Sequence, residues 1–121
     1  MIPTRIHGIL DYVVGAALMA VGIYLGPATA AGLAPLVAGA AAVIYSIFTR
    51  YELGVYRVIP MGTHLVLDGI SGVLLALSPW IFGFADRVWL PHLLAGILEF
   101  LVMMVSKRVP GPLPTSPVPA R

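Results

Sequence analysis

Four apolar runs, each about twenty residues long and bounded by charged residues or by Pro and Gly, limit what this chain can fold into. A bilayer core is about 30 Å thick, and a helix needs roughly 20 apolar residues to cross it. Of all residues, 60% are hydrophobic and only 10% are charged, which excludes a soluble globular fold. We predict an all-α membrane protein with four transmembrane helices, at residues 6–25, 31–49, 63–84 and 88–106.

The basic residues predict how the chain sits in the membrane. Six of the seven fall on the side that holds both termini and the loop at residues 51–62, and only Arg87 falls on the other side. Because cytoplasmic loops carry an excess of Lys and Arg, we expect a multi-pass protein of the bacterial inner membrane with both termini cytoplasmic. The net charge is only +2, so we predict no nucleic-acid partner. The six residues are Arg5, Arg50, Arg57, Lys107, Arg108 and Arg121.

The chain also matches itself when it is shifted by 57 residues. Residues 2–50 align with residues 59–107 without a gap, and 13 of the 49 positions are identical. Only about four or five identities are expected by chance from such a skewed composition. We predict a duplicated helical hairpin whose two copies are parallel repeats, related by a pseudo-two-fold axis along the membrane normal.

This duplication divides the chain into three parts. The first hairpin repeat occupies residues 1–57, and the second occupies residues 58–108. The segment 109–121 has five prolines in thirteen residues, a composition that excludes a helix. We predict a disordered cytoplasmic tail there.

The second repeat contains the triplet Ser-Pro-Trp at residues 78–80, followed by Ile-Phe-Gly-Phe and then by Trp89 and Gly96. This pattern resembles the SPW repeat family of small bacterial membrane proteins. The resemblance implies a two-helix unit with the triplet in its first helix, and it implies no particular activity. The first repeat has Val-Gly-Ile at the aligned positions 21–23, so it fits the family by its shared His, Asp and Gly residues instead.

Ionisable residues recur within the apolar runs. His7 and Asp11 share one helix face with Gly15, and the second repeat has His64 and Asp68 at the matching positions. The fourth run adds Glu99, whose counterpart in the first repeat is an alanine. A charged carboxyl group near the membrane centre costs about 2.5 to 3.5 kcal/mol, so we expect these stripes to face the bundle interior as a polar cluster.

Three interpretations of this cluster are open. The residues can satisfy a structural need of the hairpin, they can form a proton or ion path, or His7 and His64 can ligate a metal ion or a haem from opposite sides. The structural interpretation is preferred, because the spacing matches no standard ligand signature, and no cofactor is expected. No nucleophile elbow, phosphate loop or zinc-protease pair is present, which argues against an enzyme.

Two further features lie toward the opposite side of the membrane. Pro79 is expected to kink its helix next to Trp80, which shapes the bundle or forms a gate. His92, Asp86 and Arg87 are expected to be solvated there.

The chain is therefore predicted to be a structural or accessory membrane protein that associates laterally with itself or with a larger membrane complex. The alternative is a small proton-coupled or ion-conducting transporter, or a protein with a His-ligated metal or haem.

Overall fold

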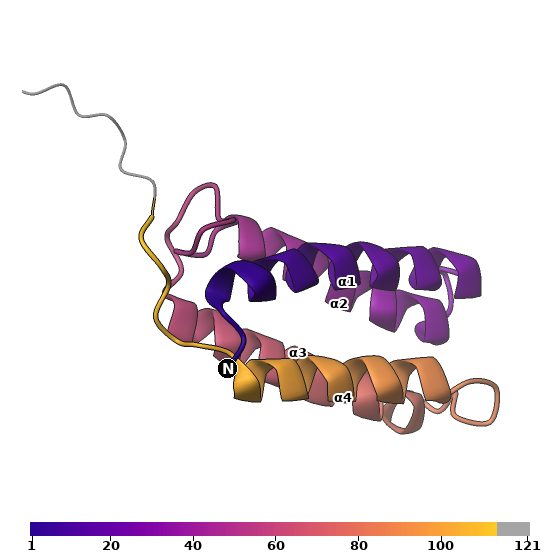
Figure 1. The fold of residues 1–121 in the computed structure, drawn as a ribbon. Helices are drawn as coiled ribbons and strands as arrows, with labels where there is room; N and C mark the ends of the chain where they lie inside the picture. The colour runs from indigo at the N-terminus through magenta and orange to yellow at the C-terminus, as the bar shows by residue number, and fades with distance from the viewer. Residues whose placement is uncertain (114–121) are drawn as a thin grey trace, which may run out of the picture.

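The computed structural model describes residues 1–113, and these residues form four α-helices and no β-strand (Figure 1). The prediction of an all-α fold with four helices is confirmed. The fourth helix is shorter than predicted, because residues 82–89 form turns and the helix starts only beside Pro91. The helices are α1 (Thr4–Leu25), α2 (Ala30–Ile47), α3 (Met61–Ile81) and α4 (Leu90–Val105).

The helices have the lengths of a membrane bundle. Three of them, α1, α2 and α3, are long and apolar enough to cross a membrane, and α4 is a shorter apolar helix of 16 residues. Large apolar side chains are exposed along every helix, and buried side chains are often small or polar. This distribution suits a bilayer, since lipid accepts apolar side chains on the outside of a protein.

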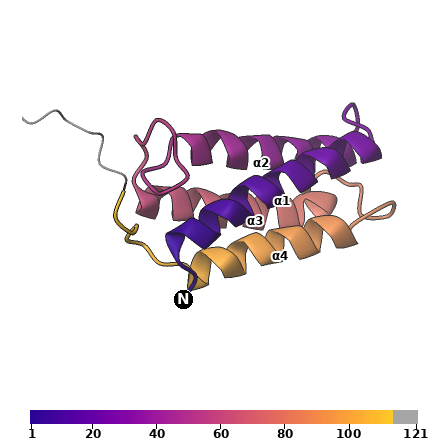
Figure 2. The same cartoon turned by 45° about the horizontal axis from the view of Figure 1, so that its top comes forward.

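The helices form two antiparallel hairpins that run in the same direction (Figures 1 and 2). In the first hairpin α1 packs on α2, in the second α3 packs on α4, and the hairpins meet chiefly through α2 and α3. One end of the bundle, which we call the terminal end, carries residues 1–3, 48–60 and 106–113. The other, the hairpin-turn end, carries residues 26–29 and 82–89.

Glycines allow the two helices of each hairpin to approach closely. A Cβ atom on Gly39 of α2 would collide with the carbonyl oxygen of Gly15 of α1. The same relation holds in the second hairpin, where a Cβ atom on Gly96 of α4 would collide with the carbonyl oxygen of Gly72 of α3. Only glycine fits where backbones touch, so these positions determine how each hairpin packs.

Backbone contacts at the terminal end tie each hairpin to the other. The amide of Ile2 donates to the carbonyl of Val105 at 2.8 Å, and the amide of Ile59 donates to the carbonyl of Phe48 at 2.7 Å. The beginning of each hairpin is therefore held by the end of the other. The two contacts stand 57 residues apart in the sequence.

The loop between α2 and α3 contacts the start of α1 through Glu52. The hydroxyl of Thr4 donates to the Glu52 carboxylate at 2.7 and 2.9 Å, and the amide of Gly111 donates to it at 3.0 Å. Partial burial acts to raise the pKa of Glu52, but the hydrogen bonds from Thr4 and from backbone amides outweigh it and hold that pKa below its ordinary value. The carboxylate therefore fastens the loop and the chain after α4 to the first turn of α1.

Most polar residues of the stripes on α1 and α3 are buried in the bundle. Buried residues of α1 include His7, Gly15 and Leu18, and those of α3 include His64 and Asp68. The tail prediction concerns residues 109–121, of which 114–121, with Arg121, lie outside the described residues.

Candidate functional site

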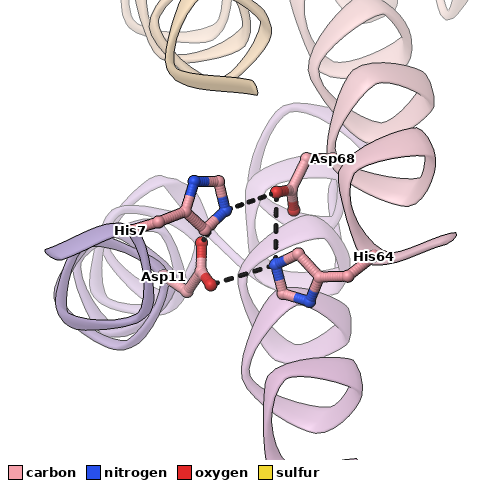
Figure 3. Close-up of side chains that lie close together, drawn as sticks. All are labelled: His7, Asp11, His64 and Asp68. Carbon is pink, nitrogen blue, oxygen red and sulfur yellow. Dashed lines mark hydrogen bonds and ion pairs between the residues drawn. The ribbon is translucent and has the colours of Figure 1, made fainter. Parts of the chain in front are cut away.

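Four side chains meet between α1 and α3, close to the terminal end (Figure 3). The Nε2 atom of His7 lies 2.8 Å from an oxygen of Asp68 and 3.2 Å from an oxygen of Asp11. The Nε2 atom of His64 lies 3.0 Å from Asp11 and 3.2 Å from Asp68. Each helix therefore contributes one histidine and one aspartate to a ring in which nitrogen and oxygen alternate. We call these four residues the His/Asp ring.

Helix starts place the two histidines. Pro3 and Pro60 precede α1 and α3 in an extended conformation, and their carbonyls accept the amides of His7 and His64, each at 3.0 Å. Proline suits this position, because its fixed φ agrees with a helix start and the first turn leaves its amides unpaired. Each histidine consequently stands in the first turn of its helix, and the aspartate follows one turn later on the same face.

Hydroxyl groups determine which histidine nitrogen carries a hydrogen. The hydroxyl of Thr49 donates to the carbonyl of Tyr45 at 2.7 Å, and its oxygen lies 2.7 Å from Nδ1 of His64. A hydroxyl has one hydrogen, so its oxygen must accept from His64, whose Nδ1 therefore donates. The hydroxyl of Ser106 likewise donates to the carbonyl of Val102, and its oxygen lies 2.7 Å from Nδ1 of His7. That oxygen must therefore accept from Nδ1 of His7.

Both histidines are thus held with Nδ1–H pointing outward and Nε2 pointing into the ring. Each hydroxyl comes from the hairpin that does not carry the histidine it binds: Thr49 follows α2 and binds His64 of α3, and Ser106 follows α4 and binds His7 of α1. An outer partner on Nδ1 that orients Nε2 is the usual arrangement around a metal-ligating histidine.

Three hydroxyls hold the carboxylates. Tyr45 of α2 donates to Asp68 at 2.6 Å, Tyr51 of the following loop donates to Asp11 at 3.0 Å, and Ser46 donates to Asp11 at 3.3 Å. Burial, together with the nearby charge of Asp11, raises the pKa of the Tyr51 hydroxyl. Tyr51 therefore remains a hydrogen-bond donor to the carboxylate across the ordinary pH range.

The two histidines differ in the pairing of their Nε2 atoms, because that of His7 is hydrogen-bonded to Asp68 at 2.8 Å. The Nε2 atom of His64 is buried and makes no well-directed hydrogen bond to any residue from 1 to 113, although two carboxylate oxygens lie within 3.2 Å of it. One ligand atom from each of the four residues can be chosen so that all lie within 4.8 Å of one another. Two imidazole nitrogens and two carboxylates at such spacing can hold a metal ion.

Glu99 lies beside this ring. It lines a cavity of about 80 Å³ together with His7, Asp11 and Asp68, and the other walls are mostly aliphatic side chains of α1 and α4. No direct hydrogen bond joins Glu99 to the ring within the described residues, and its Oε2 atom is buried without a partner there. Ala42, its counterpart 57 residues earlier, lines the same cavity.

The Ser-Pro pair of the triplet has a local physical role at the hairpin-turn end. Pro79 has no amide hydrogen, so the carbonyl of Leu75 loses its usual helical partner. The hydroxyl of Ser78 donates to that carbonyl at 2.7 Å instead. Pro79 is buried two residues before the last residue of α3, and Trp80 is half exposed, 6.3 Å from Trp89 between ring centroids.

The expectation that His92 is solvated is wrong, whereas Asp86 and Arg87 are exposed. His92 is 1% exposed, and its Nε2 lies 2.7 Å from the carbonyl of Ala31 in α2. That carbonyl is free because the residue four positions later is Pro35, which has no amide hydrogen to give it. A carbonyl can only accept, so Nε2 of His92 donates.

The hydroxyls around the ring were not predicted from the sequence. Thr49 and Ser106 are hydroxyl residues 57 positions apart, and this match was the available signal. Tyr45, Ser46 and Tyr51 have no such match in the second repeat, so no pattern marked them.

One comparison with known proteins, against protein-family models, identifies a family for this chain. No curated protein and no solved structure matches it significantly. A family model described as the SPW repeat domain matches residues 5–106, which include all four helices except the first residue of α1. This small membrane protein therefore belongs to the SPW repeat domain family.

Proposed function

We propose that this protein binds one divalent transition-metal ion, with Zn²⁺ the best fit, in the His/Asp ring between its two hairpins. The observation that carries the proposal is that the Nε2 atom of His64 lacks a hydrogen-bond partner among residues 1–113. This atom is buried, lies 3.0 and 3.2 Å from two carboxylate oxygens, and makes no well-directed hydrogen bond within the described residues. An ion at the ring centre would accept its lone pair, and the carboxylates would face the same ion.

The distances in the ring are compatible with a four-coordinate ion. Ligands at about 2.0 to 2.2 Å from zinc stand roughly 3.3 to 3.6 Å apart along the edges of a tetrahedron. The four nitrogen-to-oxygen contacts of the ring measure 2.8 to 3.2 Å, and Asp11 uses a different oxygen toward each histidine. One ligand atom from each of the four residues lies within 4.8 Å of the others, so binding requires a movement of the side chains around the ion. Two carboxylates also neutralise two positive charges, which makes such a centre compatible with a low-dielectric bundle.

A haem suits this site less well than an ion. The imidazole rings of His7 and His64 are 5.3 Å apart between centroids and nearly perpendicular. A haem would need a flat macrocycle between them, but Asp11 and Asp68 lie within 3.2 Å of both Nε2 atoms. The carboxylates occupy the space that the macrocycle would need.

The proposed role of the ion is to join two copies of one hairpin. We propose that residues 1–57 and 58–108 are duplicated units, a proposal supported by the recurrence of close helix packing and backbone contacts 57 residues apart. Each unit supplies one histidine and one aspartate, so an ion bound by all four would crosslink the units. The tail at 109–121 lies beyond these units.

Elemental analysis tests the metal proposal. Protein purified in detergent, incubated with zinc and freed of excess metal should retain one zinc per chain. His64→Ala and Asp11→Asn should reduce retention at least tenfold, because each removes a ligand. Val66→Ala is the matched control, since Val66 is on α3 near His64 but is 56% exposed. Wild-type protein that retains no more zinc than His64→Ala would contradict the proposal.

Lateral association with a second copy or with a larger membrane complex is the second candidate function. It is supported by an apolar groove of about 340 Å³ between α2 and α3 near the hairpin-turn end, lined by residues such as Leu33, Val37 and Leu74. Cysteine at Val37 should form disulfide-linked dimers in membranes if the groove lies at a contact between copies. Monomers at every lipid-to-protein ratio would exclude self-association there.

We also propose that the terminal end faces the cytoplasm of a bacterial inner membrane. Arg5, Arg50, Arg57 and Lys107 support this orientation, because they lie at the terminal end, whereas Arg87 lies at the hairpin-turn end. Arg87→Cys should react with an impermeant thiol reagent in intact cells, and Tyr56→Cys should react only after lysis. The reverse pattern would invert the assignment.

A further inference from the structure

We infer that the groove between α1 and α4 binds an amphiphilic molecule from the bilayer, with an apolar chain and a hydrogen-bond-donating head, a hydroxyl or an amine. The head would lie against Glu99, and the chain would run toward His92. This inference does not rest on the proposed metal ion. It rests on two adjoining cavities and on a buried acceptor, Oε2 of Glu99, that lacks a donor among the described residues.

The two cavities share walls. The first, about 80 Å³, contains the Glu99 side chain, and the second, about 260 Å³, lies toward the hairpin-turn end and reaches His92. Val14 of α1 and Leu98 of α4 line both cavities, so the cavities adjoin along the groove between these helices. The hairpins meet chiefly through α2 and α3, which leaves the α1–α4 side less closely packed.

The walls indicate an apolar occupant. Apart from His92, every residue that lines the larger cavity is apolar, including Val13, Ala17 and Ala95. Both Val13 and Leu98 are more than half exposed on the lipid-facing surface, so the groove is open to the bilayer side. The molecules available on that side are hydrocarbon chains with polar heads.

The polar end of the groove indicates what the occupant must donate. The Oε2 atom of Glu99 is buried and has no hydrogen-bond partner among residues 1–113. A donor in the head of the occupant would pair with this atom and remove the cost of an unpaired buried acceptor.

The length of the groove agrees with an elongated molecule. His92 and Glu99 are seven residues apart on α4, which places them on the same face and about 10 Å apart along the axis. Neither residue has a counterpart of the same type 57 residues earlier, because the matching positions in the first hairpin are Pro35 and Ala42.

Photoaffinity labelling tests the inference. Protein in nanodiscs is exposed to a 12-carbon alcohol that carries a diazirine at its chain end, illuminated, and analysed by peptide mass spectrometry. Labels should concentrate on residues 13–21 and 91–98, and unlabelled 1-dodecanol should compete, whereas dodecane should not. Glu99→Leu, which removes the acceptor, should reduce labelling at these residues at least fivefold, and Glu99→Gln, which keeps an acceptor oxygen, should retain it.

Matched variants separate this groove from ordinary lipid contact. Leu98→Trp fills the groove and should block labelling, whereas Leu94→Trp, one turn away and 57% exposed, should not. Even labelling over all lipid-facing helices, or labelling unchanged by Glu99→Leu, would overturn the inference. Disulfide crosslinks between two chains that carry Ala17→Cys would assign the groove to a second copy and would also overturn it. His64→Ala, which removes a proposed metal ligand, should retain labelling of the groove. Failure of the metal proposal can therefore be distinguished from failure of this inference.

Discussion

The Nε2 atom of His7 lies 2.8 Å from a carboxylate oxygen of Asp68, a residue 61 positions later in the chain and in the other hairpin. His64 and Asp11 make the reciprocal approach at 3.0 Å. Because each pair crosses between hairpins, separating the hairpins would break both contacts together. The stability of the bundle should therefore depend on what the ring contains.

Removal of the proposed zinc ion should destabilise the protein. An ion that binds only the folded state adds about 2.7 kcal/mol of stability when its free concentration is a hundred times its dissociation constant. Zinc should therefore raise the melting temperature of the wild type, and a chelator should reverse the rise. In Asp68→Asn the zinc-dependent rise should disappear. Circular dichroism in detergent measures this, and a melting temperature indifferent to zinc and chelator would contradict a shared metal site.

The hydroxyls that orient the histidines should tune metal affinity. Thr49→Val keeps the shape of the side chain but removes the oxygen that accepts from Nδ1 of His64. Thr49→Val should therefore lower the affinity for zinc about 10- to 100-fold, as is usual when such a partner of a ligating histidine is removed. Thr49→Ser keeps the hydroxyl and is the control. Competition with a fluorescent zinc chelator gives the affinities, and equal affinities for Thr49→Val and Thr49→Ser would show that this hydroxyl does not orient a ligand.

The effects of substitutions at His92 and Pro35 on stability should be coupled, because both residues determine the partner of the Ala31 carbonyl. His92→Phe preserves an aromatic ring but leaves that partly buried carbonyl without its side-chain partner, at a cost of about 1 kcal/mol. Pro35→Ala returns an amide hydrogen that can pair with the same carbonyl within the helix. The double variant should therefore be more stable than His92→Phe alone. Chemical unfolding of the four proteins of this cycle measures the coupling, and strictly additive effects would contradict it.

The contact between Glu52 and Thr4 should make stability depend on acid pH. The pKa of Glu52 lies below its ordinary value in the folded protein, so its contribution is present at neutral pH and is lost as the pH falls through that lowered value. Glu52→Gln should be less stable than the wild type at pH 7, and the difference should shrink below about pH 4. Melting temperatures from pH 3 to pH 7 check this, and a difference that widens in acid would contradict it.

The sequence by itself predicted the membrane class, the four helices and the buried stripes. These features follow from local physics, because hydropathy adds along a run and helical periodicity places His7, Asp11 and Gly15 on one face. The approximate ends of the helices follow in the same way from Pro, Gly and charge. The match at 57 residues further indicated that His64 and Asp68 are placed in α3 as His7 and Asp11 are in α1.

Only the tertiary structure decided which side chains meet. The sequence indicated neither that Thr49 binds His64 while Ser106 binds His7, nor that His92 is buried against Ala31. Such contacts depend on how far each helix is rotated about its axis and on how the hairpins cross, and close packing of many residues sets both. A periodic pattern predicts which face of a helix is buried. The packing between the hairpins determines which residues that face contacts.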